Sequence, residues 1–374
     1  VAIIILMLAV AKLTAQNYQF KSLDNDTIRY TYTPIDQSYA HGNSSGRSLA
    51  KLLTGEPLAI SILPIYTFET NLGIALSAKY SQQKFAVSAA AIATLSGYYN
   101  IAVEGNNIIH SRHNIGYGAK LLSFPSRLWG LTFDSASSNS YHGYTSRELG
   151  AWIEYRLSLT TKTTLSICAD YSYINIPKAD VEVATLLDDE QLTISSAGIS
   201  ANLSYDSRRK ASHYQQQGIY TNIGAKYHPQ ILSNTDGDIW HFEATFDYYQ
   251  PLWKGGTIAL DIYGGHVTKN TPFLLQNELG GNSRMRGYYP GRFRGNTLLS
   301  TQLELRQHIW QGIGMVAWDG AGTVFSPNDR FAWRKILPTY GIGLRYCHEL
   351  LTIRADVGFG RKSFNIILGI GEAF

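Results

Sequence analysis

Outside its N-terminus, this 374-residue sequence lacks any long uninterrupted apolar run. A helix that crosses a bilayer needs about 20 predominantly apolar residues, so helical membrane spans are excluded. Charged residues are also few, at 16%. Lys and Arg are scattered rather than gathered in a block, and the net charge is only +4. This distribution argues against nucleic acid as a partner.

Cysteine is nearly absent, with only Cys168 and Cys347, and two such distant residues do not establish a disulfide. The sequence has no phosphate-binding loop and no dinucleotide fingerprint. His110 and His113 lie three residues apart without further ligands nearby, so no metal site is expected. Gly42–Gly46 fits G-x-S-x-G but lacks the strand and helix that a nucleophile elbow needs. We therefore predict no enzyme, no catalytic residue, no metal and no cofactor.

The sequence is instead rich in aromatic residues and glycine, with 25 Tyr, 7 Trp and 34 Gly. Such a composition with few charges suits an all-β protein whose aromatic side chains form belts at two membrane interfaces. Residues 1–15 resemble a secretory signal peptide, because a short apolar core precedes a small-residue cleavage site. Residues 16–56 are polar and predict a short periplasmic or lumenal leader. Residues 57–374 carry the strand-like periodicity.

From about residue 57 onward, apolar and polar residues alternate with a period of two, as clearly in Trp240–Tyr248, Leu299–Ile309 and Leu351–Phe359. These segments reach the ~9–11 residues that a tilted strand needs to cross a bilayer. A soluble β-sandwich also alternates. Here, however, short and long connections alternate too, as they do in outer-membrane barrels. We predict an all-β fold, a transmembrane antiparallel β-barrel of about 16 strands in a bacterial outer membrane.

The long connection near residues 268–296 carries the most specific motif. It is a hydrophobic–Arg–Gly–aromatic tetrad that two carboxylates follow downstream: Met285, Arg286, Gly287, Tyr288, Glu304 and Asp319. This pattern resembles the C-terminal barrel of the bacterial surface antigen family, the BamA–TamA-like outer-membrane assembly-factor superfamily, which also includes the two-partner secretion transporters. Tyr205–Arg208 with the later Gly218, and Pro64 with the segment 69–73, are weaker matches.

The resemblance implies that the long external loop folds into the barrel lumen, where its Arg meets carboxylates on the wall. Alternation places Glu304 on the lumen face, and we expect Asp319 to face the lumen as well, opposite to Trp318. Gly287 is expected to let the loop backbone turn sharply. We call the six motif residues the lumen latch, and we predict a structural rather than a catalytic role for them.

The two ends of the barrel are expected to meet at a seam between residues 58–67 and 364–374. Gly369 and Gly371 weaken the last strand, since glycine in a strand interior has no side chain to pack. Phe374 gives this strand a terminal aromatic residue, although Glu372 stands where an apolar or aromatic residue is expected. Because unpaired strand edges are costly in lipid, a frayed seam is poised to accept a partner edge.

The first functional hypothesis is an assembly or translocation factor that helps to insert or transport proteins or lipids through this weak seam. Its expected partners are lipopolysaccharide, phospholipid, client outer-membrane proteins or a periplasmic partner, and a second copy in a homodimer. A second hypothesis is a passive porin-like channel, because about 16 strands leave room for a water-filled lumen. A third makes the barrel an anchor for a separate partner or a homo-oligomer. The leader is too short for periplasmic POTRA repeats, so a barrel-only member is expected.

Overall fold

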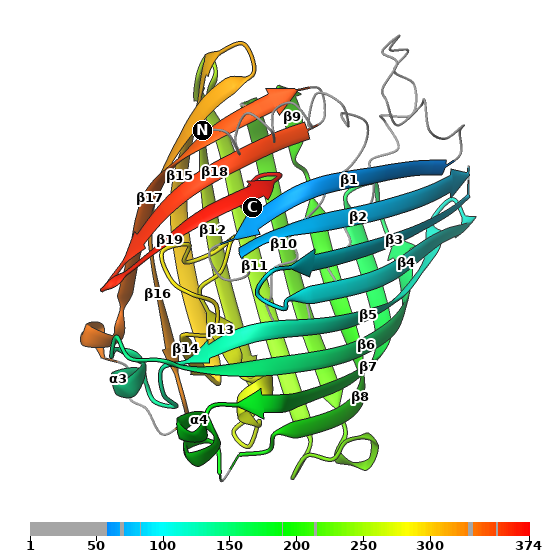
Figure 1. The fold of residues 1–374 in the computed structure, drawn as a ribbon. Coiled ribbons are helices and arrows are strands. Elements are labelled where there is room, and N and C mark those ends of the chain that lie inside the picture. Colours follow the sequence, from blue (N-terminus) through cyan, green and yellow to red (C-terminus); the bar gives the residue numbers. More distant parts are fainter. Residues whose placement is uncertain are drawn as a thin grey trace.

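The computed structural model describes residues 58–67, 71–82, 84–188, 190–212, 215–327, 332–348 and 351–374. The expected signal peptide and leader, and the G-x-S-x-G match, lie outside these residues. The described chain forms a ring of long antiparallel strands with a few short helices at one end (Figure 1). None of the helices in this part of the chain has the length and apolar character of a membrane span.

The wall consists of long strands that pair in chain order, and a separate two-stranded sheet lies in one connection. The wall strands are β1 (Leu58–Thr67), β2 (Asn71–Gln82), β3 (Phe85–Thr94), β4 (Tyr99–His110), β5 (His113–Leu128), β6 (His142–Ser158), β7 (Thr163–Ala179), β8 (Thr193–Asp206), β9 (Arg209–Ser212), β10 (Gln215–His228), β11 (Ile239–Trp253), β12 (Gly256–Val267), β15 (Thr297–Trp310), β16 (Ile313–Phe325), β17 (Leu337–His348), β18 (Leu351–Gly360) and β19 (Ser363–Ile370). The separate sheet pairs β13 (Asn277–Leu279) with β14 (Phe293–Gly295).

The main sheet holds 17 strands, but β8 and β9 both pair with β10 and act as one interrupted strand. If β8 and β9 are counted as one strand, the wall of the described chain has 17 − 1 = 16 strands, which confirms the predicted number. The connections are short at one end of the barrel, such as the turns from β11 to β12 and from β15 to β16. At the other end most connections are longer, and two of them contain the helices α3 (Phe133–Ala136) and α4 (Val181–Leu186). In outer-membrane barrels the short-turn end faces the periplasm.

The two faces of the wall have opposite chemistry, as β15 shows most clearly. Its outward residues Leu299 and Leu303 are both 47% exposed, whereas the inward Gln302, Glu304 and Arg306 are buried. Apolar side chains outside and polar side chains inside are the reverse of a soluble β-sandwich. The alternation read from the sequence therefore reflects lipid on the outer face and a polar lumen within.

The long connection between β12 and β15 folds into the lumen, as predicted. Leu279, Met285, Tyr288 and Phe293 of this loop are buried in one apolar cluster together with wall residues. The two cysteines of the chain are buried and free, so they form no disulfide.

The ring closes through a single residue pair between its first and last strands. β1 pairs with β2 along all ten of its residues, from Leu58 to Thr67. β19 likewise pairs with β18 along its length. Between β1 and β19, by contrast, only Thr67 and Ile367 are partners. Most of the β1 edge that faces β19 is therefore left unpaired by strand β19 in the described structure.

Candidate functional site

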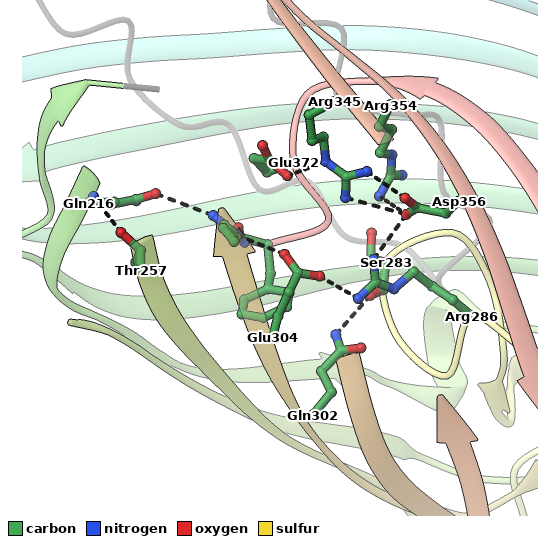
Figure 2. Close-up of polar contacts among 12 residues, drawn as sticks. Gln216, Thr257, Ser283, Arg286, Gln302, Glu304, Arg345, Arg354, Asp356 and Glu372 are labelled. Carbon is green, nitrogen blue, oxygen red and sulfur yellow. Dashed lines mark hydrogen bonds and ion pairs between the residues drawn. The ribbon is translucent and has the colours of Figure 1, made fainter. Parts of the chain in front are cut away.

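Arg286 lies at the centre of the lumen site and is fully buried, with 0% of its surface exposed. Its Nη2 donates to Oε2 of Glu304 at 2.5 Å, and its Nη1 donates to Oδ2 of Asp356 at 2.9 Å. The guanidinium carbon also lies 3.6 Å from the centre of the Trp318 ring. Figure 2 shows Arg286 reaching between the two carboxylates. One loop side chain thus joins β15, β16 and β18 through charge-assisted hydrogen bonds and a cation–π contact.

The structure contradicts the predicted lumen position of Asp319. This residue is exposed on the outer face of β16, and its partners in register, Leu303 and Tyr340, are exposed outward as well. The reason is parity: Trp318 takes the inward position, so the next residue must point outward. The prediction placed both on the wrong faces, and the second carboxylate of the site is Asp356 instead. Asp356 alternates with the apolar residues of its strand, which was the available signal for its lumen position.

Gly287 is needed because the loop backbone approaches the wall closely. A Cβ atom on Gly287 would lie 2.2 Å from the backbone carbon of Phe359, a distance that real Cβ atoms essentially never show. Its N–H donates to Oγ1 of Thr339 at 3.3 Å, and its carbonyl accepts from Oγ of Ser363 at 2.7 Å. The left-handed backbone conformation falls on Met285, with φ of 50°. Close approach rather than a sharp turn therefore explains this glycine.

Three wall glycines, which we call the glycine trough, make room for the latch: Gly341, Gly358 and Gly360. A Cβ atom at Gly341 would meet the Trp318 ring at 2.3 Å, and one at Gly360 would meet the Tyr288 ring at 2.4 Å. At Gly358 it would lie 2.7 Å from the Arg286 carbonyl oxygen. The wall strands β17 and β18 are thus shaped to receive the loop, a feature that the sequence reading missed.

Tyr288, the last residue of the tetrad, lies against Gly360 of the glycine trough. Its hydroxyl donates to the Pro338 carbonyl at 2.8 Å and accepts from the Arg361 N–H at 2.6 Å. Burial raises the pKa of Tyr288 above its ordinary value, so this hydroxyl keeps its proton and its donor role. The tetrad therefore binds the loop to the wall at each of its four residues.

Further loop arginines bind the loop at other points. Arg284 binds both carboxylate oxygens of Asp261 on β12, with Nη2 2.6 Å from Oδ2. Arg292 donates to the carbonyl oxygens of Ala136 and Ser138, at the end of α3. These contacts distribute the attachment of the loop over several strands. Arginines in an external loop are common, and the sequence pattern offered no signal for these partners.

The carboxylates that hold Arg286 are shared with two more buried arginines. Nε of Arg306 donates to Glu304 at 2.7 Å, and Nη1 of Arg345 donates to Asp356 at 2.5 Å. We call these five residues, Arg286, Glu304, Asp356, Arg306 and Arg345, the lumen network. Four of the five side chains, those of Arg286, Glu304, Asp356 and Arg345, are 0% exposed, and that of Arg306 is 2% exposed.

The C-terminal residues enter this network instead of extending the last strand. β19 ends at Ile370, and Gly371 has φ of 87°, a conformation that favours glycine. Beyond it, the Glu372 carboxylate accepts from Nε of Arg345 at 2.8 Å (Figure 2). The Phe374 carbonyl oxygen accepts from Nη2 of Arg306 at 3.0 Å. The expectation that Gly371 and Phe374 belong to the seam strand is therefore wrong, whereas Gly369 does lie within β19.

Glu372 is ionised at this position despite its surroundings. Burial alone would raise the pKa of its carboxyl group, but the neighbouring Arg345 and Arg306 guanidinium groups hold that pKa below its ordinary value. A charged carboxylate therefore anchors the end of the chain in the lumen. Across the described ranges of the chain, no group of three or more His, Cys, Asp or Glu side chains is placed to hold a metal ion.

Comparisons with known proteins agree with this architecture. The family model of the Omp85 superfamily domain matches residues 72–374. BamA from Haemophilus ducreyi lacking POTRA domains 1–3 is similar in structure, with a TM-score of 0.63, 12% identity, and 84% of this chain and 70% of that chain covered. CdiB from Escherichia coli gives a TM-score of 0.60 and 11% identity, covering 84% of this chain and 61% of that chain. CdiB from Acinetobacter baumannii gives 0.57 and 11%, covering 84% and 59%. No curated protein matches the chain.

Proposed function

Because the chain belongs to the Omp85 superfamily of outer-membrane assembly and secretion barrels, we propose that it assists the insertion or transport of proteins or lipids through the seam between β1 and β19. The family membership confirms the resemblance seen in the tetrad, and it makes the chain an outer-membrane protein. The superfamily acts in assembly or transport rather than in enzymatic catalysis. The seam as the place of action is our proposal.

The observation that carries the proposal is the single pair between Thr67 and Ile367. Backbone groups in lipid need hydrogen-bond partners, and an unsatisfied group costs several kcal/mol. Every other junction of the wall is paired over many residues, as between β18 and β19. Opening therefore costs least at the seam, where the edge of β1 can accept an incoming strand by β-augmentation.

The lumen is less suited to the passive channel. The long loop buries Met285 and Tyr288 against the wall, and the arginines of the same loop bind β12, β15 and β18. Because the loop occupies part of the lumen, the open cross-section is smaller than that of an empty barrel of 16 strands. We also propose outer-membrane lipids and client barrels as partners. Homodimer formation and the anchor role stay predictions.

Depletion of the protein tests this function in cells. If it assists biogenesis, depletion is expected to lower specific outer-membrane proteins, or to change the lipid of the outer leaflet, within the period of protein dilution. The measurement is quantitative profiling of outer-membrane proteins and lipids, with re-expression of the wild-type chain as the control. An unchanged profile of both classes, together with loss of solute uptake, would instead support the channel.

A further inference from the structure

The last four residues, Gly371–Phe374, form a segment that we call the strap. It leaves β19 and turns into the lumen at the short-turn end, where it contacts side chains of β17, β15 and β11. The Phe374 ring lies 5.2 Å from the guanidinium carbon of Arg306 and 6.2 Å from the centre of the Tyr249 ring. Ala373 is 6% exposed. The first strap residue, Gly371, still donates its N–H to the Thr352 carbonyl of β18 at 2.8 Å. The residues beyond it are held in the lumen by an ion pair, a hydrogen bond from Arg306 to the Phe374 backbone and aromatic packing.

A straight continuation of β19 would place the same residues along the part of the β1 edge that β19 does not pair with in the described structure. Thr67 and Ile367 are partners, and antiparallel pairing keeps the sum of paired residue numbers constant, here 67 + 367 = 434. Continued to the end of the chain, this register sets Glu372 opposite Ile62. The strap thus has two alternative positions, one in the lumen and one in the sheet.

The chemistry of Glu372 decides between the two positions. Directly paired residues share a face of the sheet, and Ile62 is 57% exposed on the outer face. In the sheet position, the Glu372 carboxylate would therefore face lipid, where charged groups are destabilising. In the lumen, Arg345 offers it a charge-assisted hydrogen bond instead. This explains why an acidic residue stands where a membrane strand would carry an apolar one.

We propose that Arg306 and Arg345 form a docking site for a peptide tail of the acidic–x–aromatic type, and that the strap occupies this site reversibly. The docked strap leaves the β1 edge open, and the released strap pairs with β1 and closes the seam. The consequence for insertion rests on the proposed function, whereas the exchange between the two positions does not.

The docking site is linked to the latch through shared carboxylates. Glu304 accepts hydrogen bonds from both Arg286 and Arg306, and Asp356 accepts from both Arg286 and Arg345. Without Arg286, both carboxylates are left with the two docking arginines and compete more strongly with the strap for them. A seated loop therefore favours a docked strap, and by linkage a docked strap favours a seated loop.

A cysteine pair reports the position of the strap directly. Ser61 and Ala373 satisfy the same register, because 61 + 373 = 434, so Ser61→Cys and Ala373→Cys can form a disulfide only when the strap lies along β1. The full chain is purified with Cys168→Ser and Cys347→Ser and is oxidised in lipid vesicles. Little disulfide is expected in this parent. Glu372→Leu is expected to raise the yield roughly tenfold, the ratio that corresponds to ~1.4 kcal/mol.

Arg286→Ala is expected to raise the yield as well, and Arg284→Ala is the matched control. Arg284 is an arginine of the same loop, but it binds Asp261 outside the lumen network, so its variant should keep the parental yield. Glu372→Gln keeps the side-chain size and is the second variant in case Glu372→Leu misfolds. Migration of unheated samples on gels reports whether each barrel is folded. An equal or lower yield in folded Glu372→Leu, or a near-complete yield in the parent, overturns the exchange. Neither result depends on client insertion, so the proposed function is tested separately.

Discussion

Arg286→Ala is expected to lower the free energy of unfolding of the barrel by ~3–5 kcal/mol and to release the long loop from the lumen. The physical reason is that Glu304 and Asp356 are buried and lose the cation that they share. Removing one partner of a buried ion pair costs about this much, and here two buried carboxylates each lose one of their two guanidinium partners. Urea unfolding measures the stability, and protease cleavage within residues 268–296 measures the release.

Two further variants separate charge from geometry and the lumen from the outer face. Arg286→Lys keeps the charge but lacks the planar fork that reaches two carboxylates, so it should recover only part of the loss. Asp319→Leu removes an outward carboxylate that the tetrad does not contact, and it should leave the loop protected. Loop release by Asp319→Leu as complete as that by Arg286→Ala would contradict the assignment of Asp356 to the site.

Gly287→Val is expected to displace the latch from the wall while leaving every charge of the lumen network in place. Its Cβ atom would overlap the backbone of Phe359, and a strand backbone in a paired wall cannot shift away as a flexible side chain can. Overpacking of this kind typically costs ~1–3 kcal/mol, occasionally more. The loop cleavage assay should show exposure close to that of Arg286→Ala.

Gly237→Val is the matched control for this substitution. Gly237 lies in the connection between β10 and β11, and a Cβ atom there meets nothing within 4 Å. The control should be protected like the wild type. Protection of Gly287→Val at the wild-type level would show that the close approach to β18 does not hold the loop.

The barrel and its internal loop could be predicted from the sequence because each rests on a local pattern. Alternation over whole strands such as Leu351–Phe359 is repeated many times, so single errors do not change the fold. The partnership of Arg286 with Glu304 followed from the tetrad and from parity within β15. Both features depend on residues near one another along the chain or within one strand.

The second carboxylate and the strap could not be predicted in the same way. Asp319 is near the motif in sequence, but neighbouring residues of a strand point to opposite faces of the wall. Because the Trp318 side chain points into the lumen, that of Asp319 points outward. Asp356 reaches Arg286 from 70 residues downstream, through the lateral order of the strands. The strap depends on the backbone of one residue, Gly371, and on two arginines of other strands, Arg306 and Arg345. The one sequence feature that indicated the strap was Glu372, an acidic residue at a position where an apolar one is expected.

A reversible lock across the seam tests the central claim most directly. Thr67→Cys and Ile367→Cys join the only pair between β1 and β19 in the described structure, in a chain with Cys168→Ser and Cys347→Ser. The measurement is the rate at which a denatured outer-membrane barrel inserts into vesicles that contain the oxidised or the reduced variant.

The matched control is Val357→Cys with Ile366→Cys, which joins β18 to β19 where they are already fully paired. We predict that the oxidised seam pair abolishes the added insertion rate, that reduction restores it, and that the control pair inserts clients whether oxidised or reduced. Insertion by the locked seam at the rate of its reduced form would contradict the account.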